Sequence, residues 1–87
     1  MRFDTLVFTT NWFEEYERLS NTDRRRFRRA LALLETNEEH PSLRVHPLHG
    51  RLEGVWSASA SDSLRMTFER LPNGRKALLT CSNHYGD

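Results

Sequence analysis

With 87 residues, the chain is long enough for one hydrophobic core, and we expect residues 1–87 to form a single domain. Its net charge of +1 argues against a broad, non-specific binder of polyanions. A single cysteine, Cys81, rules out an intramolecular disulfide framework and favours a reducing cytoplasm. No apolar run approaches the roughly 20 residues that cross a bilayer, and the first residues lack a secretory signal, so we expect no membrane contact.

Arginine dominates the basic residues, because only Lys76 among the 13 is a lysine. The planar guanidinium group binds phosphate through two hydrogen bonds and stacks on bases, which lysine does less well. This bias favours contact with nucleic acid. A GC-rich genome gives the same bias without any function, so both interpretations stay open.

The N-terminal part predicts a strand and then a helix. The run from Phe3 to Phe8 is rich in residues that favour strands. Thr9 or Thr10 can cap the helix that follows, because a hydroxyl accepts a hydrogen bond from an amide of the first turn. Apolar side chains then recur with helical spacing at Trp12, Tyr16 and Leu19.

A second helix is predicted over about residues 23–37, after a break and cap at Ser20–Asp23. Its apolar stripe consists of Phe27, Ala30, Leu31 and Leu34, and much of the remaining surface carries Arg24, Arg25, Arg28 and Arg29. The arginines fit two interpretations: a solvated helix face, or a contact surface for RNA phosphates or an acidic partner.

The C-terminal half predicts a loop over His46–Gly50, a hairpin with arms 55–60 and 64–70, and a last strand over 76–82. Alternation on the return arm places Arg65 and Thr67 opposite the apolar residues. On the last strand it groups Ala77, Leu79 and Cys81 on one side and Leu78, Thr80, Ser82 and His84 on the other. We therefore expect an α+β fold in which two N-terminal helices pack on a small, mostly antiparallel sheet (β-α-α-β-β-β), with Arg65 and His84 on its open side.

Several catalytic patterns are missing from the sequence. His46 and His49 are three residues apart, but no further ligands complete a zinc pattern, and no glycine-rich phosphate loop or nucleophile elbow is present. We expect neither a metal nor a cofactor. Histidines can transfer protons near neutral pH, and arginine can stabilise negative charge on phosphate. Phosphoryl transfer on RNA without a metal is the chemistry that remains.

Four segments, two of which overlap, resemble the RelE/ParE superfamily of bacterial toxins, and the resemblance covers essentially the whole chain. Leu48–Ser57 (LHGRLEGVWS) is similar to the family pattern L-x-G-x-L-x-G-x-W-S, and Ser63–Phe68 (SLRMTF) resembles the hairpin strand with its phosphate-binding arginine. The ending Asn83–Tyr85 resembles the His-Tyr terminus of the YoeB type. His46–Gly50 (HPLHG) resembles the His-Pro-Leu-x-Gly of the YafQ type.

The resemblance implies an endoribonuclease that cleaves mRNA in the ribosomal A site through attack of the ribose 2′-hydroxyl. Arg65 would then stabilise the scissile phosphate, His84 would be the general acid, and Tyr85 would orient the substrate. His46 is the candidate general base, although another group in that role stays open. We expect His49, Arg44 and Arg51 to bind RNA.

An alternative within the same superfamily is a ParE-like toxin that inhibits DNA gyrase by binding, without cleaving RNA. The His-Tyr ending favours the ribonuclease. Both alternatives imply a cytoplasmic protein of a type II toxin–antitoxin system, with a cognate antitoxin as its partner. For the ribonuclease, mRNA and the ribosome are further expected partners.

Overall fold

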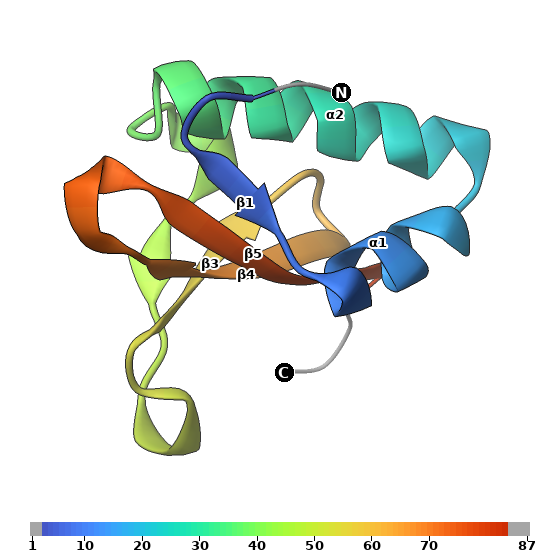
Figure 1. Ribbon diagram of the computed structural model, residues 1–87. Helices are drawn as coiled ribbons and strands as arrows, with labels where there is room; N and C mark the ends of the chain where they lie inside the picture. Colours follow the sequence, from blue (N-terminus) through green and yellow to red (C-terminus); the bar gives the residue numbers. More distant parts are fainter. Residues whose placement is uncertain (1–2, 84–87) are drawn as a thin grey trace.

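A five-stranded mixed sheet with two helices on one face forms the fold of residues 3–83, the part of the chain that the computed structural model describes (Figure 1). The strands are β1 (Leu6–Phe8), β2 (His46–Pro47), β3 (Val55–Ser59), β4 (Leu64–Arg70) and β5 (Lys76–Asn83), in the spatial order β1-β5-β4-β3-β2. The helices are α1 (Thr10–Glu17) and α2 (Asn21–Thr36), and three short 3₁₀ turns are η1 (Pro41–Leu43), η2 (Gly50–Leu52) and η3 (Pro72–Gly74).

This arrangement confirms the predicted α+β class. β1 pairs with β5 in parallel, and the remaining pairs are antiparallel. One predicted feature is wrong: His46 and Pro47 do not belong to a loop but form the edge strand β2, opposite Ser57 and Trp56. A strand of two residues has too few positions to show alternation, so only the tertiary pairing reveals it.

Both helices begin with the predicted hydroxyl caps. Thr9 Oγ1 accepts a hydrogen bond from Trp12 N, and Ser20 Oγ accepts one from Asp23 N at 3.1 Å. α2 consequently starts at Asn21, two residues before the predicted position. Neither helix combines the length and the apolar character that a membrane span requires, within residues 3–83.

The core lies between the helices and the covered face of the sheet. The predicted stripe of α2 is buried, and Trp12 of α1 is fully buried with its ring stacked on Tyr16. The other buried apolar side chains are Leu6, Leu43, Ala58, Leu64, Met66, Phe68, Leu78 and Cys81. These contacts fix α1 and α2 relative to the strands, because burying large apolar side chains is the main stabilising contribution in a small domain.

Two of the four predicted helix arginines hold the helices together. Arg24 donates hydrogen bonds to the carbonyl oxygens of Tyr16 and Glu17, and Arg28 donates one to the Tyr16 hydroxyl at 2.6 Å. Arg25 and Arg29 are exposed. Arg24 and Arg28 therefore stabilise the packing of α2 on α1, whereas Arg25 and Arg29 remain on the solvated surface.

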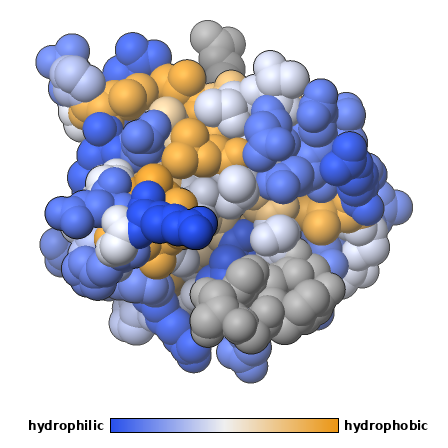
Figure 2. Space-filling model, turned by 90° about the horizontal axis from the view of Figure 1, so that it is seen from below, coloured by the Kyte–Doolittle hydropathy of each residue, from blue (hydrophilic) through white to orange (hydrophobic). Residues whose placement is uncertain are grey.

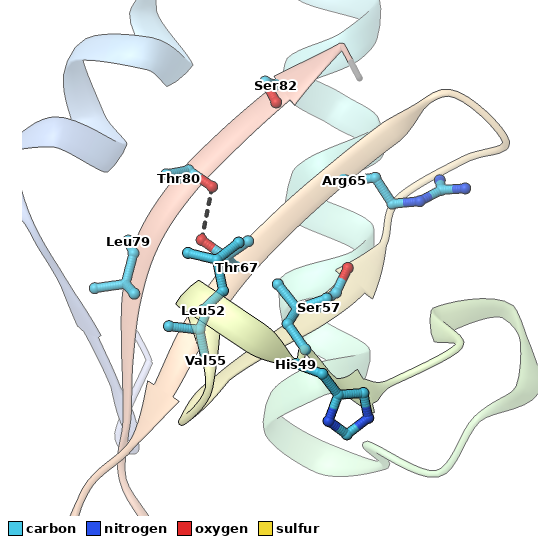
Figure 3. A pocket seen from close by; sticks show the side chains of 10 residues that line it. His49, Leu52, Val55, Ser57, Arg65, Thr67, Leu79, Thr80 and Ser82 are labelled. Carbon is cyan, nitrogen blue, oxygen red and sulfur yellow. Dashed lines mark hydrogen bonds between the residues drawn. The ribbon is translucent and has the colours of Figure 1, made fainter. Parts of the chain in front are cut away.

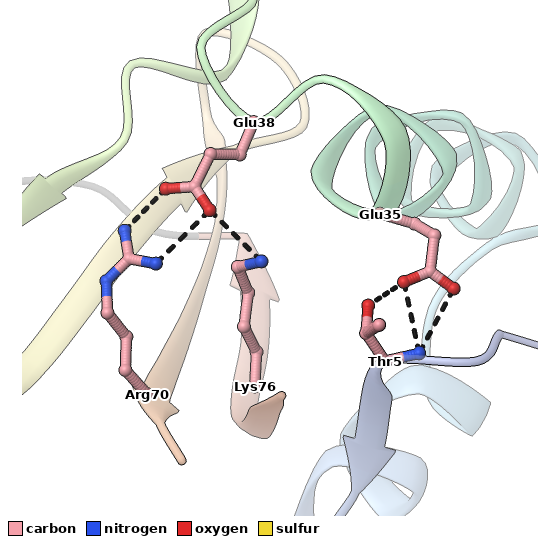
Figure 4. Close-up of polar contacts among 5 residues, drawn as sticks. All are labelled: Thr5, Glu35, Glu38, Arg70 and Lys76. Atoms are coloured by element: carbon pink, nitrogen blue, oxygen red, sulfur yellow. Dashed lines mark hydrogen bonds and ion pairs between the residues drawn. The ribbon is translucent and has the colours of Figure 1, made fainter. Parts of the chain in front are cut away.

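Two glutamates tie the C-terminal end of α2 to the sheet (Figure 4). Glu35 accepts hydrogen bonds from the backbone amide and the hydroxyl of Thr5, just before β1. Glu38 binds Arg70 of β4 through two hydrogen bonds of 2.5 and 3.2 Å, and Lys76 of β5 at 3.0 Å. The carboxylates thereby connect the helical layer to three strands.

A bulge in β5 overturns part of the predicted alternation. Thr67 lies opposite Thr80, but Phe68 lies opposite Leu78, so Leu79 has no partner on β4. The extra residue shifts the side-chain pattern by one position. Leu78 is therefore buried with the core, whereas Leu79, predicted on the side of Cys81, lies on the open face beside Thr80.

Candidate functional site

The open face of the sheet carries a pocket of about 480 Å³ between the strands and the segment around η2 (Figure 3). Figure 2, which views the molecule from the side opposite α2, shows apolar surface interleaved with hydrophilic side chains on this face. The residues that line the pocket are Leu48, His49, Leu52, Val55, Ser57, Arg65, Thr67, Leu79, Thr80 and Ser82. Three strands and one turn thus build one concave site.

The pocket has an apolar wall and a polar floor. Leu48, Leu52, Val55 and Leu79 form the wall, and the Leu52 side chain in η2 is 53% exposed. On the floor, the hydroxyl groups of Thr67 and Thr80 bond each other at 2.7 Å across β4 and β5. The η2 segment turns over this floor between Gly50 (φ 72°) and Gly54 (φ 94°), in conformations that residues with a Cβ rarely adopt.

Arg65 provides the positive charge of the pocket. Its Nη1 donates to the carbonyl oxygens of Ser61 at 2.8 Å and Leu64 at 3.3 Å, which orients the guanidinium beside the hairpin turn. None of the ion pairs between described residues includes Arg65. Most of its N–H donors are therefore left for a ligand, and phosphate matches their geometry.

His46 lies near this pocket without lining it. Ser57 is opposite His46, Thr67 is opposite Ser57, and Arg65 is two residues from Thr67. With about 4.8 Å between strands and 3.4 Å per residue, the Cα atoms of His46 and Arg65 are roughly 12 Å apart on one face. Extended side chains can meet around one phosphate group from that separation.

The hydrogen bond of His46 determines which ring nitrogen carries the proton. Its Nδ1 lies 2.8 Å from the carbonyl oxygen of Arg44, which can only accept. Nδ1 is therefore the donor, and the neutral ring keeps a lone pair on Nε2. Arg44 has a left-handed backbone conformation (φ 48°, ψ 45°) at the end of η1, and the imidazole itself is exposed.

The other predicted site residues are placed differently. His49 lines the pocket, whereas the exposed Arg51 does not, and Arg44 borders two separate hollows near His40 and Ser61. His84 and Tyr85 lie outside the described residues. No group of three or more His, Cys, Asp or Glu side chains that could hold a metal occurs within the described range.

Several residues that line the pocket were not predicted from the sequence. Alternation placed Thr67 beside Arg65 and grouped Thr80 with Ser82, so that signal was available for the polar floor. The apolar wall gave no such signal, because Leu48 and Leu52 belong to an irregular segment and Leu79 to the bulge. Together, wall and floor suit a ligand with a flat apolar part and an anionic part.

No family model matches the sequence, and no curated protein matches it significantly. Solved structures do match. The YoeB/ParE toxin from Agrobacterium tumefaciens has a TM-score of 0.75 at 20% identity, over 94% of this chain and 100% of that one. The YoeB–YefM complex from Staphylococcus aureus has a TM-score of 0.73 at 18% identity, over 98% and 100%.

The E. coli DinJ–YafQ toxin–antitoxin complex gives a TM-score of 0.73 at 14% identity, over 97% of this chain and 94% of that one. The similarity therefore extends over nearly the full length of both YoeB-type and YafQ-type chains. At these identities it establishes the fold and leaves the activity to be tested. The expectation of a RelE-like fold is confirmed: the chain has the fold of the YoeB and YafQ toxins.

Proposed function

We propose that the protein is the toxin of a type II toxin–antitoxin system and cleaves mRNA in the pocket beside Arg65. The observation that carries this proposal is the guanidinium of Arg65, which makes no ion pair with a described residue and opens into a pocket that His49 also lines. The fold shared with the YoeB and YafQ toxins supports it.

In the proposed reaction, the ribose 2′-oxygen attacks the adjacent phosphorus and the bond from phosphorus to the 5′-oxygen breaks. A base takes the proton of the 2′-hydroxyl, and an acid gives a proton to the leaving 5′-oxygen, so the products are a 2′,3′-cyclic phosphate and a 5′-hydroxyl. Arg65 stabilises the negative charge that develops on the phosphate oxygens. The reaction therefore requires one cation that stabilises the phosphate, one base and one acid.

His46 is our proposed base, because its Nδ1–H bond to Arg44 leaves Nε2 as the accepting nitrogen. His49 lines the pocket itself and is proposed to bind the phosphate, with Arg51 and Arg44 contacting RNA further out. We propose His84 as the acid and Tyr85 as the group that orients the substrate, on the resemblance of the Asn83–Tyr85 ending to YoeB-type toxins.

An antitoxin partner belongs to the same proposal. The solved complexes of similar toxins contain the antitoxins YefM and DinJ. A protein partner that covers the pocket would exclude RNA from Arg65. We further propose that the substrate is mRNA bound to the ribosome in the cytoplasm.

The proposal is tested by brief expression of the wild type and of Arg65→Ala, followed by mapping of the 5′ ends of cellular mRNA. The wild type should arrest growth and create new 5′-hydroxyl ends, and Arg65→Ala should abolish both. Arg75→Ala is the matched control, because Arg75 is exposed and does not line the pocket. Arrest without new mRNA ends, together with loss of negative DNA supercoiling, would instead identify a gyrase inhibitor.

A further inference from the structure

The outer edge of β5 is only partly covered by a neighbouring strand. β1 pairs with Lys76, Ala77 and Leu78 and then ends, whereas β5 continues to Asn83. The backbone groups that follow Leu78 on this edge need other partners, because unpaired buried amides and carbonyls are costly. Figure 1 shows that α1 lies beside this part of β5.

Side chains of α1 and of its cap take the place of the missing strand. Thr9 Oγ1 donates to the carbonyl oxygen of Leu78 at 2.8 Å, and Asn11 Nδ2 donates to that of Leu79 at 2.9 Å. Glu15 Oε1 accepts a hydrogen bond from the amide of Cys81 at 2.9 Å. Asn11 and Glu15 are four residues apart and thus lie on one face of the helix.

The side chains of α1 bind the bulged part of β5, which also lines the pocket. Leu79 has no partner on β4, and the side chains of Leu79, Thr80 and Ser82 line the pocket on the open face of the sheet. In Figure 3, Thr80 bonds Thr67 next to the bulge. The contacts with α1 and the side chains that line the pocket therefore belong to the same stretch of β5.

Without the bulge, the register would be different. If β5 continued regularly from the pair of Phe68 with Leu78, Thr80 would lie opposite the buried Met66, and Cys81 would lie opposite Arg65. A slip of one residue moves every later side chain to the other face. The polar floor of the pocket would then lose Thr80 and Ser82.

Glu15 makes the strongest of the bonds that oppose this slip, because its acceptor is charged. Its carboxylate lies close to the Cys81 side chain, whose Sγ donates to the carbonyl oxygen of Trp12 at 3.6 Å. Burial, with a smaller contribution from Glu15, raises the pKa of the Cys81 thiol to about 12. In the native register Cys81 is therefore buried and unreactive.

We propose that Glu15 is a positioning residue of the candidate site. It anchors the amide of Cys81 and so keeps the bulge at Leu79 in place and the side chains of Thr80 and Ser82 in the pocket. Asn11 supports the same anchor from the preceding turn of α1. The inference that this affects catalysis depends on the proposed RNA cleavage, whereas the control of the β5 register does not.

Thiol reactivity reports on the register, because Cys81 is buried in the native register and would lie on the open face after a slip. Loss of the Glu15 charge also makes the thiol easier to ionise, and Glu15→Gln, which removes the charge but keeps an acceptor, separates the two effects. In Glu15→Ala, modification of Cys81 by a thiol reagent at pH 8 should be about 10- to 100-fold faster than in the wild type, as expected for the loss of a charge-assisted hydrogen bond. Glu15→Gln keeps an acceptor oxygen and should fall between the two. Glu14→Ala is the matched control, because Glu14 lies on the same helix and is exposed.

RNA cleavage by the same variants tests positioning. For Glu15→Ala we expect kcat to fall at least about tenfold at nearly constant KM, with partial rescue in Glu15→Gln. Glu38→Gln loosens the fold at a distant contact, so it should leave kcat unchanged and should accelerate Cys81 modification less than Glu15→Ala does. Equal Cys81 reactivity in Glu15→Ala and Glu14→Ala, or equal effects in Glu15→Ala and Glu38→Gln, would overturn the proposal.

The two readouts separate this proposal from the proposed function. If the wild type cleaves no RNA, the proposed function fails, and Cys81 modification alone decides whether Glu15 holds the register. If the wild type cleaves RNA and Glu15→Ala exposes Cys81 with unchanged kcat, Glu15 is not a positioning residue for the reaction.

Discussion

The carboxylate of Glu38 should make the stability of the fold depend on acidic pH. Hydrogen bonds from Arg70 outweigh the effect of burial and, with Lys76, lower the pKa of Glu38 from 4.5 to about 2. The same pairing raises the pKa of Arg70. Since the pKa is lower in the folded state, the contribution is fully present above pH 4.5 and is lost as the pH falls toward 2.

The size of this contribution follows from the shift and the exposure of the group. A change from 4.5 to about 2 corresponds to about 3.4 kcal/mol at 1.36 kcal/mol per unit. Because 27% of the Glu38 side chain is exposed, screening by water reduces this to about 1–2 kcal/mol. Glu38→Gln should lower the free energy of unfolding by that amount at pH 7.

Glu38→Ala should cost more than Glu38→Gln, about 2–4 kcal/mol. The Lys76 side chain is only 9% exposed, so its ammonium group would lose its acceptor in a poorly hydrated place. Glutamine keeps an oxygen there, whereas alanine leaves the buried charge unpaired. We therefore expect the free energy of unfolding to be lowest for Glu38→Ala, intermediate for Glu38→Gln and highest for the wild type. This order tests whether the Lys76 ammonium group needs Glu38 as its acceptor.

The assay is urea unfolding of the wild type and Glu38→Gln at pH 7 and pH 3.5. By linkage, a contribution of about 1–2 kcal/mol at pH 7 should fall to about 20–40% of that value at pH 3.5, and it should shrink further toward pH 2. Glu39→Gln is the control, because Glu39 is the exposed neighbour. A difference that does not vary with pH, or an equal loss in Glu39→Gln, would refute the argument.

Three further predictions concern the backbone, the core and the thiol. Arg44→Gly should raise the free energy of unfolding by about 0.5–1 kcal/mol in urea titrations, because Arg44 has a φ of 48° and its ion pair with Asp62 is long and exposed. Trp12→Ala should lower it by about 3–5 kcal/mol, since the ring is fully buried. Cys81, whose thiol pKa is raised to about 12, should resist iodoacetamide at pH 8 in the native protein and react in 6 M urea, as mass spectrometry would show.

The sequence was most informative where one local pattern and one local cap agreed. Trp12 follows a threonine that can cap, and the stripe that includes Phe27 and Leu31 follows Ser20, so both helices could be predicted. The hairpin arms were equally clear, because Arg65 alternates with buried apolar neighbours. Each of these signals operates within a few residues, where side-chain spacing and capping chemistry dominate.

The candidate site was predicted only in part, because its shape depends on contacts between distant segments. Arg65 was placed on the open face by alternation alone, and this prediction needed no tertiary information. The position of Leu79 did need it, because the bulge lies where side chains of α1, not a neighbouring strand, supply partners for the edge of β5. Glu15 and Cys81 are 66 residues apart in sequence, so no periodicity in either segment could reveal their bond.

The same reasoning explains why the pocket and the edge strand appear together. β2 contributes only His46 and Pro47 to the sheet, yet this pairing fixes where the chain leaves the sheet for the η2 segment before it returns as β3. That segment places Leu52 over the floor that Thr67 and Thr80 form. Hence β2 and the β5 bulge, which local patterns cannot predict, lie on opposite sides of Arg65 and together give this face of the sheet the pocket that we propose as the RNA site.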